Sequence, residues 1–369
     1  MKKNILTFIL IFFSLAILAQ DKVTNELKNL SDTQQFDKII SQYTSEYKDF
    51  SAKSLYYIGL AYYMKEDDTN CIKFMDLAIN KDSKDPAPAY IKASTLNYMG
   101  KYNEAITYFQ NAINLNPNDA ESYSGLGDSY YQIKEFNLSL ENYKKATLQK
   151  ECPNRPYLML AQIYYEQKEN DKALEAYYTA KSKISKESHS YINVLFNIGL
   201  LESLKGNYEK AEPVFIELIQ LDPADYHSYA KLIQIYYSRK EYEKAKPYKD
   251  KLYEAYAKGE LKDNLKDMFC YDQFKWNGYQ VQAFERYENK NKGNIYNKHL
   301  FYLINDSGQI VLRVQTEFSP ISIELGGTKY LLCASKGNTH YNSGIGFNDD
   351  LNYSDLKTEA IKLFEKYNK

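Results

Sequence analysis

The sequence predicts a mainly α protein in two parts, an α-solenoid of about six to seven helix–turn–helix repeats followed by a small antiparallel α+β domain. Two observations predict the solenoid: residues 53–261 repeat a pattern with a period of about 34 residues, and each copy holds two apolar stretches joined by a polar turn. A third observation predicts the second part, because from residue 262 glycine becomes denser and the apolar pattern falls to a period of two.

One small residue recurs at the same place in each copy, which we call the anchor position. Successive anchors are evenly spaced, apart from one longer step between Ala161 and Gly199. A small side chain lets two paired helices approach closely, and a bulky one would push them apart. We therefore expect similar helix pairs along the array, with different packing at the last anchor, which is not small. The six anchors are Gly59, Ala93, Gly127, Ala161, Gly199 and Ile233.

Each copy also carries large apolar residues three and four places on either side of its anchor, as Leu55 and Tyr62 do around Gly59. That spacing places them on one stripe of a helix. A second small residue, such as Ala105 or Ala173, follows the anchor by twelve places. The pattern resembles the tetratricopeptide repeat, a helix–turn–helix unit of this period. The resemblance implies stacked helix pairs whose first helices line a concave surface, but no particular chemistry, because architecture defines the family.

The array has an atypical start and an irregular end. Residues 20–52 resemble an imperfect capping repeat, because the stretch after Gln35 echoes the start of a second helix at Tyr102. Terminal repeats differ from internal ones because their outer face meets water. The longer step between anchors falls at residues 182–190, where we expect about one extra turn of 3.6 residues in a helix or loop. The full repeats cover residues 53–261.

Residues 262–369 are predicted to form an antiparallel β-rich domain with a C-terminal helix. Asn277-Gly278 supplies the positive φ values of a tight hairpin turn, and residues 305–309 and 326–327 are further turns. Residues 339–347 are expected to add a last short strand, and Ser354 to cap the helix. The predicted hairpin strands are residues 271–276 with 279–287, 299–304 with 310–316, and 321–325 with 328–335. The apolar face of the helix consists of Leu356, Ala360, Leu363, Phe364 and Tyr367.

Residues 1–19 have the layout of a secretory signal peptide. A basic start at Lys2 and Lys3 precedes an apolar run from Ile5 to Leu18, and Ala19 is a small residue suited to cleavage. A membrane anchor is the alternative, but the run is shorter than the roughly 20 residues that a span needs. We therefore expect an exported protein, periplasmic or secreted, with no integral membrane span after cleavage.

Charge and cysteine content bear on partners and cofactors. With 47 basic and 48 acidic residues, the chain lacks the basic surplus typical of nucleic-acid binding. Export permits disulfides, and Cys270 and Cys333 are conceivable partners, although the sequence leaves the pairing open. No CxxC motif or Cys/His ligand spacing occurs, so we expect no metal and no cofactor. His340 follows Cys333 by seven places, and a Cys–His nucleophile is one interpretation. Such neighbours are more often incidental, so we expect no catalytic residues.

The resemblance also implies which side chains face the concave surface, namely those three places before, and one, four and five places after, each anchor. Tyrosine occupies the place four after the anchor in four of the six copies. A groove lined by tyrosine suits an extended peptide or a helix, because the rings stack on side chains while the hydroxyls reach backbone groups. Alternatively, these tyrosines only pack within the fold, or the groove holds sugars. The predicted partner-binding residues are Tyr56, Tyr63, Tyr90, Asn97, Asp128, Tyr131, Gln162, Tyr165, Gln234 and Tyr237.

These observations predict a non-catalytic scaffold or adaptor that binds a protein or peptide partner through the concave face of the solenoid. Carboxylate-ended chaperone tails are disfavoured as partners, because Tyr56 and Leu60 stand where such family members carry lysine and asparagine. Two alternatives stay open. The C-terminal domain is a module that the repeats position, either catalytic or binding a ligand such as a glycan or cell-wall fragment, or the protein is a structural subunit of an envelope assembly.

Overall fold

The computed structural model describes residues 21–287, 298–318, 330–347 and 352–368. The chain divides into two compact units, Met1–Ser185 and Lys186–Lys369, called here the first and the second unit. The predicted signal peptide and the predicted strand at residues 321–325 lie outside the described residues. Within the described part of the chain, no helix is both long enough and apolar enough to cross a membrane.

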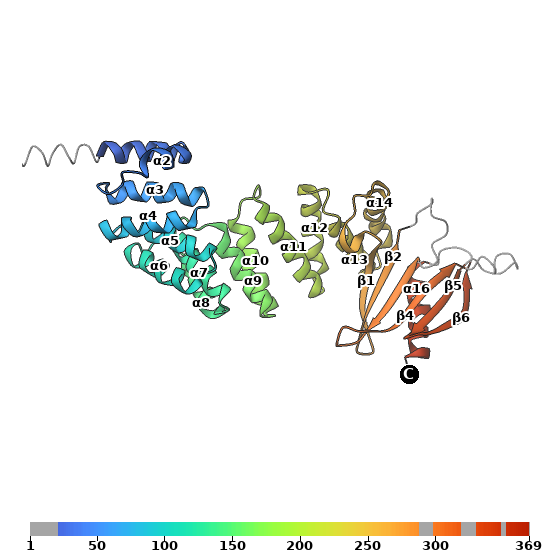
Figure 1. Cartoon of the computed structure of the whole chain (residues 1–369). Helices are drawn as coiled ribbons and strands as arrows, with labels where there is room; N and C mark the ends of the chain where they lie inside the picture. Colours follow the sequence, from blue (N-terminus) through green and yellow to red (C-terminus); the bar gives the residue numbers. More distant parts are fainter. Residues whose placement is uncertain (1–20, 288–297, 319–329, 348–351, 369) are drawn as a thin grey trace, which may run out of the picture. The chain divides into compact units, whose positions relative to one another are not determined.

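The first unit is a stack of helix pairs (Figure 1). Its helices are α2 (Phe36–Tyr43), α3 (Ala52–Met64), α4 (Asp68–Lys81), α5 (Pro86–Tyr98), α6 (Tyr102–Leu115), α7 (Ala120–Gln132), α8 (Phe136–Thr147), α9 (Asn154–Glu166) and α10 (Asn170–Lys183). Consecutive helices from α2 to α10 contact each other, and α3, α5, α7 and α9, the first helices of successive pairs, also contact one another. This arrangement confirms the predicted solenoid. Helical residues 21–32 precede α2, as expected for the leading repeat.

Several of these helices begin at a serine or aspartate cap. The side-chain oxygen of Ser51 accepts a hydrogen bond from the backbone N–H of Ser54 at the start of α3. Asp67 and Asp119 make the equivalent bond at the starts of α4 and α7. Such bonds satisfy N–H groups that the first turn of a helix leaves unpaired. The polar connections between the apolar stretches therefore determine where these helices start.

The anchor positions lie where the two helices of a pair pack most closely. A Cβ atom added at Gly127 would lie 2.8 Å from Cε1 of Tyr143 in α8, and one at Gly59 would lie 2.8 Å from Cε of Met75 in α4. Both separations are shorter than van der Waals contact, so a larger side chain would force the facing side chain of the second helix to move. The last anchor, Ile233, is fully buried, so the last helix pair accommodates a large side chain at this position.

The second unit combines two helix pairs, a sheet and a final helix. Its elements are α11 (His189–Leu204), α12 (Tyr208–Leu221), α13 (Tyr226–Ser238), α14 (Tyr242–Lys258), η1 (Asp263–Leu265), β1 (Met268–Trp276), β2 (Tyr279–Arg286), β3 (His299–Ile304), β4 (Ile310–Phe318), β5 (Tyr330–Lys336), β6 (Thr339–Phe347) and α16 (Tyr353–Tyr367). Helix α11 has 16 residues, whereas α9 and α13 have 13 each. The longer step in the repeat therefore lengthens a helix, as expected.

The six strands form one antiparallel sheet in the order β1-β2-β3-β4-β5-β6. Two predicted hairpins are confirmed, because Asn277-Gly278 joins β1 to β2 and residues 305–309 join β3 to β4. Asn277 and Gly278 both have positive φ, as the tight turn requires. The expected last strand is β6, which pairs with β5. The sheet is therefore a simple meander.

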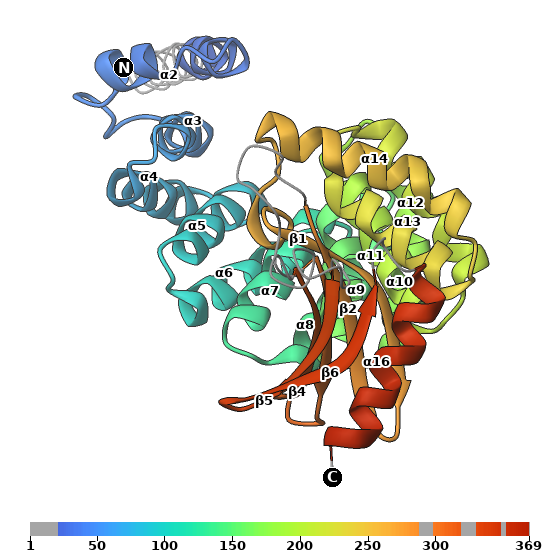
Figure 2. The ribbon, with the colours of Figure 1, turned by 90° about the vertical axis from the view of Figure 1, so that its right-hand side faces the viewer.

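Helix α16 covers one face of the sheet (Figure 2). Four residues of the predicted apolar face, Leu356, Ala360, Leu363 and Phe364, are buried, and the fifth, Tyr367, is half-buried. Its cap is Asn352 rather than the predicted Ser354. The Asn352 side chain accepts a hydrogen bond from the N–H of Asp355, whereas Ser354 already lies in the first turn. Because the cap must precede the first helical residue, Ser354 comes two residues too late.

The predicted disulfide between Cys270 and Cys333 is wrong. Cys270 lies in β1 and Cys333 in β5, so three strands separate them. Neighbouring strands are about 4.8 Å apart, which places the two cysteines roughly 19 Å from each other across the sheet. A disulfide needs Cα atoms within about 7 Å. The thiols of both residues, and those of Cys71 and Cys152, are free.

The repeat array and the sheet pack together within the second unit, where α13 contacts β1. The Gln234 side-chain nitrogen in α13 donates to the carbonyl oxygen of Cys270 in β1 at 3.0 Å. Lys249 in α14 pairs with Glu285 in β2 at 2.7 Å. The predicted boundary between residues 261 and 262 marks the change from helix to strand, but the compact unit begins at Lys186. The sheet therefore packs directly against the last helix pair and is not joined to it by a linker alone.

Candidate partner-binding surface

The ten predicted partner-binding residues are divided between the two units. Eight of them, from Tyr56 to Tyr165, lie in the first unit, and Gln234 and Tyr237 lie in the second. All ten side chains are half-buried. A partner surface is therefore considered within the first unit alone, where the first helices of successive pairs are in contact.

Four of these residues stand at the same place on successive first helices. They form what we call the first-helix row, which consists of Tyr63 in α3, Asn97 in α5, Tyr131 in α7 and Tyr165 in α9. Hydrogen bonds connect neighbouring helices along the row. The Ser129 hydroxyl in α7 donates to Oδ1 of Asn97 at 3.2 Å, and the Tyr131 hydroxyl donates to Oε1 of Glu166 at 2.8 Å. These bonds link the row from α5 through α7 to α9, and α3 in turn contacts α5.

The two ends of the row are Tyr63 and Tyr165. Among the described residues, neither the Tyr63 nor the Tyr165 hydroxyl has a hydrogen-bond partner. The Tyr63 ring packs against Cys71, Met75 and Ile91, and burial raises its pKa. Tyr63 therefore combines a packed ring with a polar tip that no described residue binds, a combination that is common where one protein binds another.

Two exposed apolar side chains directly follow residues of the row in the sequence, one place further along each helix. Met64 at the end of α3 is 51% exposed, and Tyr98 at the end of α5 is 76% exposed. Both occupy the place five after an anchor, so the resemblance indicated their position, although neither was among the ten predicted residues. Methionine and tyrosine are enriched in the buried centre of protein interfaces. The row is therefore most open at α3 and α5.

The two tyrosines three places before an anchor serve mainly to pack the fold. Tyr56 lies against the core around Leu55 and Ile58, with Nζ of Lys53 4.6 Å from its ring centroid. The Tyr90 ring lies 6.1 Å from that of Phe109, and burial raises the pKa of Tyr90 to about 12. Packing within the fold accounts for both residues.

Within the first unit, two predicted residues stand one place after an anchor, and both bond to neighbouring helices. Asp128 accepts a hydrogen bond from the Tyr143 hydroxyl in α8 and pairs with Nε of Arg155 at 2.7 Å. Gln162 receives a weaker bond from the Tyr177 hydroxyl in α10, at 3.4 Å. These intramolecular bonds occupy the polar groups that a partner would need.

Gln234 and Tyr237 face the sheet of their own chain. Besides the bond from Gln234 to β1, the Tyr237 ring lies 5.1 Å from the rings of Tyr271 and Tyr353 and 5.2 Å from that of Tyr242. The sequence did not indicate that other parts of the chain cover these two residues, because the repeat pattern of α13 resembles that of the preceding first helices. We therefore leave both residues out of the proposed partner surface.

A cavity of about 300 Å³ adjoins Tyr237. It is lined by Tyr237, Tyr242, Glu243, Lys249, Tyr271, Glu285, Lys298, His299, Asn352, Tyr353 and Leu356. Its polar groups largely bind one another. Lys249 pairs with Glu285, and the Tyr271 hydroxyl lies 3.3 Å from Nδ1 of His299. The cavity therefore lies within a junction of mutually satisfied groups, and nothing among its described residues favours ligand binding over packing.

Burial and charge act in opposite directions on the ion pair in this cavity. Burial lowers the pKa of Lys249, but its attraction to Glu285 outweighs that effect and leaves the pKa above 10.5. Burial likewise raises the pKa of Glu285, but Lys249 and His299 outweigh it and leave the pKa below 4.5. Both residues are therefore charged at neutral pH.

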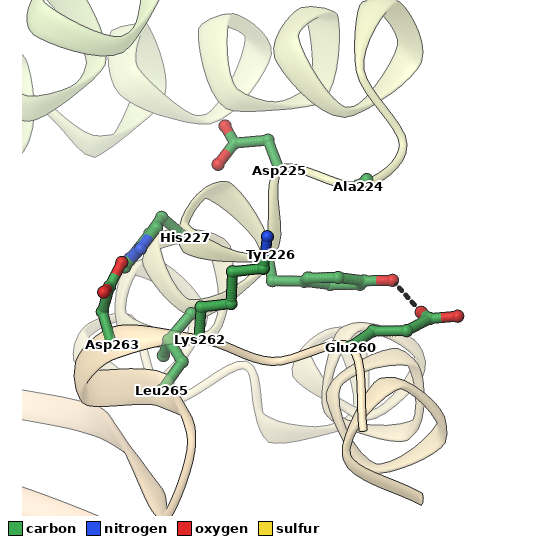
Figure 3. Close-up of a pocket in the computed structure, with 8 residues that line it drawn as sticks. All are labelled: Ala224, Asp225, Tyr226, His227, Glu260, Lys262, Asp263 and Leu265. Atoms are coloured by element: carbon green, nitrogen blue, oxygen red, sulfur yellow. Dashed lines mark hydrogen bonds between the residues drawn. The ribbon is translucent and has the colours of Figure 1, made fainter. Parts of the chain in front are cut away.

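A larger hollow of about 440 Å³ lies at the start of α13 (Figure 3). The Tyr226 hydroxyl donates to Glu260 across it, and this bond, together with burial, raises the pKa of Tyr226 to about 12. His227 and Asp263 point toward each other on its opposite side (Figure 3). Three of its eight lining residues, Glu260, Lys262 and Asp263, are exposed charged side chains. They do not converge on one enclosed point, so we interpret the hollow as the surface of a junction between α13 and the segment after α14.

The structure brings Cys333 and His340 close together, but the state of the thiol disfavours a Cys–His nucleophile. Cys333 is buried, and burial, together with the nearby Glu317 carboxylate, raises the pKa of its thiol to about 12. Catalysis by cysteine needs a thiolate, which a lowered pKa provides. Nδ1 of His340 lies 3.2 Å from the Ser335 hydroxyl.

Comparison with known proteins identifies the repeats. A family pattern described as "TPR repeat" matches residues 93–134, and one described as "Tetratricopeptide repeat" matches residues 155–182 and 192–225. A third, "Anaphase-promoting complex, cyclosome, subunit 3", matches residues 36–112. The chain thus contains tetratricopeptide repeats, an architecture that serves as a scaffold for binding other proteins.

Curated relatives match this chain over part of their length. BBSome complex member BBS4 from Bos taurus is 30% identical over 134 residues, which are 36% of this chain and 25% of that protein. TPR repeat-containing protein MJ1428 from Methanocaldococcus jannaschii is 24% identical over 195 residues, which are 53% of this chain and 32% of that protein. The matches therefore span only about a quarter to a third of these relatives.

Two solved structures are similar in part. YrrB, a TPR protein described as having an unusual peptide-binding site, is 19% identical and covers 48% of this chain and 89% of its own, with a TM-score of 0.41. The C-terminal part of a TPR repeat-containing protein from Cytophaga hutchinsonii is 17% identical and covers 55% of this chain and 79% of its own, with a TM-score of 0.47.

Proposed function

We propose that this protein is a non-catalytic, exported scaffold or adaptor that binds an extended peptide or a helix across the first-helix row of its first unit. The observation that carries the proposal is the exposure of Met64 and Tyr98, which directly follow Tyr63 and Asn97 of the half-buried row at a place that the family resemblance puts on the concave surface. The Tyr63 hydroxyl, which has no hydrogen-bond partner among the described residues, offers a polar contact in addition. Large apolar rings with a hydrogen-bonding tip anchor many protein interfaces, because they bury much area at a small entropic cost.

The geometry favours an elongated partner over a compact ligand. Equivalent side chains recur on α3, α5, α7 and α9, so contacts are offered at regular intervals along successive helices. A peptide or helix places its own side chains at regular intervals in the same way. The region around α3 and α5, where apolar side chains are exposed, is the proposed centre of binding.

Replacing Tyr63 and Tyr98 together with alanine is expected to weaken partner binding about tenfold or more, or about 1–2 kcal/mol, because buried aromatic anchors carry much of the binding energy. The measurement is titration of the purified variant with a partner that co-purifies from the native envelope. Tyr178→Ala is the matched control, because it removes an exposed tyrosine from α10, a second helix. Equal affinity of the double variant and the control would reject the first-helix row as the binding site.

Export is expected to produce a mature chain that begins at Gln20. The basis is the signal-like layout of residues 1–19, with Ala19 before the cut. Mass spectrometry of the N-terminal peptide, on protein recovered from the periplasm or the medium, measures the cleavage point. A chain that keeps Met1 and stays in the cytoplasmic fraction would contradict export.

A further inference from the structure

Three side chains of metal-ligating type converge on the sheet face opposite α16. They are Glu317 in β4, Cys333 in β5 and His340 in β6. Side chains alternate between the two faces of a strand. Tyr341 stacks on Tyr367 of α16 with ring centroids 4.3 Å apart, so the neighbouring His340 points to the other face. His340 is the cross-strand partner of Ser335, two places after Cys333, and thus shares the face of Cys333.

The spacing of the donor atoms suits one ion. The carboxylate, thiol and imidazole donors all lie within 4.8 Å of one another, and Nε2 of His340 is 3.5 Å from Oε2 of Glu317. Zinc binds nitrogen and oxygen at about 2.0–2.1 Å and sulfur at about 2.3 Å. A tetrahedral arrangement with these bond lengths puts ligand atoms roughly 3.3–3.6 Å apart. Only small side-chain movements would be needed to bring all three onto a shared ion.

Neighbouring groups already orient two of the three donors. The Gln315 amide nitrogen donates to Oε1 of Glu317, which leaves Oε2 directed toward His340. Nδ1 of His340 lies 3.2 Å from the Ser335 hydroxyl, which leaves Nε2 directed toward Glu317. Hydrogen bonds to the far atom of a ligand are the usual way in which proteins position histidine and carboxylate ligands.

A buried polar atom beside the cluster is a separate indication of a ligand. Gln315 is the cross-strand partner of Cys333 and is only 5% exposed. Its Oε1 atom is buried and has no hydrogen-bond partner within the described residues. An unpaired buried oxygen is costly unless something binds it. A cation at this place would be such a group, with Gln315 or water completing the coordination.

We propose that Glu317, Cys333 and His340 form a binding site for Zn²⁺. The donor set is one sulfur, one nitrogen and one oxygen, which suits zinc and disfavours calcium and magnesium, since these prefer oxygen ligands. His340 is half-exposed and gives the ion access from solvent. Binding replaces the Cys333 S–H bond with a sulfur–zinc bond and releases one proton to solvent, with no change of oxidation state.

The test uses the full chain, freed of metal with a chelator. Zinc is titrated in competition with a chromophoric indicator, and Co²⁺ is used as a spectroscopic substitute. Wild-type protein is expected to bind one ion and to show the near-ultraviolet charge-transfer band of a cobalt thiolate. Cys333→Ser is expected to abolish that band, and His340→Ala to weaken zinc binding about tenfold or more.

The controls are Cys270→Ser and His227→Ala, which remove a thiol and an exposed imidazole elsewhere and are expected to change neither readout. If Cys333→Ser fails to fold, His340→Ala still tests the proposal, because removing the exposed His340 side chain is expected to leave the fold intact. Wild-type protein that binds no stoichiometric zinc would overturn the proposal. So would a cobalt band or a zinc affinity that survives unchanged in His340→Ala.

Discussion

Replacing Glu285 with alanine is expected to lower the free energy of unfolding of the second unit by about 3–5 kcal/mol, because it leaves a buried charge without its partner. The Glu285 side chain is only 4% exposed and accepts hydrogen bonds of 2.7 Å from both Lys249 and the Tyr253 hydroxyl. Urea unfolding followed by tryptophan fluorescence measures the loss. Trp276 is the single tryptophan of the chain and lies in β1, so its signal reports the second unit.

The same residue predicts a pH dependence. The lowered pKa of Glu285 means that its stabilisation is present above 4.5 and is lost as the pH falls through the lower folded-state value. The raised pKa of Lys249 means that its stabilisation is present below 10.5 and is lost as the pH rises through the higher folded-state value. A Glu285→Gln variant is therefore expected to lose less stability than wild type when the pH falls below 4.5.

Glu254→Gln is the matched control, because Glu254 pairs with Lys251 and Lys258 on an exposed stretch of α14. Exposed pairs of this kind contribute about 0–1 kcal/mol. If Glu285→Ala costs no more stability than the Glu254 variant, the pair between α14 and β2 does not hold the sheet to the last helix pair.

Replacing Gly127 with leucine is expected to destabilise the first unit by about 1–3 kcal/mol, because the added side chain has no space between α7 and α8. Even a single Cβ atom there would lie 2.8 Å from the Tyr143 ring. Thermal unfolding followed by far-ultraviolet circular dichroism measures the change. Gln132→Leu adds leucine at a more open position of the same helix, its last residue, and is expected to have little effect. Equal melting of the two variants would show that the anchor position is not a point of close packing.

The elements that follow from local chemistry were predictable. The repeat period places the anchors, and the residue pairs that meet at them, such as Gly127 and Tyr143, belong to one helical hairpin. The Asn277-Gly278 turn is equally local, because two residues determine how β1 returns as β2. The helix cap was misplaced, at Ser354 instead of Asn352, because several polar side chains near a helix start satisfy the same rule.

What depends on neighbours in space was not predictable. The pattern around Tyr237 is that of an open first helix, and only tertiary packing places Tyr271 and Tyr353 against it. The supposed pairing of Cys270 with Cys333 failed because alternation within a strand carries no information on strand order. The same order brings Glu317, Cys333 and His340 together from three strands, although their spacing along the sequence matches no metal-binding motif.

The contacts of Asp272 have a consequence for the order in which the chain folds. Asp272 in β1 is buried and binds the Tyr353 hydroxyl and Nζ of Lys357, which lie 81 and 85 residues later in α16. In the first unit each helix packs on its immediate successors, so that unit gains its contacts as each helix pair leaves the ribosome. Contacts between residues far apart in the sequence form slowly, because a long stretch of chain must first be closed into a loop. The second unit therefore completes its core only after α16 has been synthesised. Until then, the Asp272 carboxylate in β1 lacks the Lys357 ammonium group with which it pairs in the folded chain.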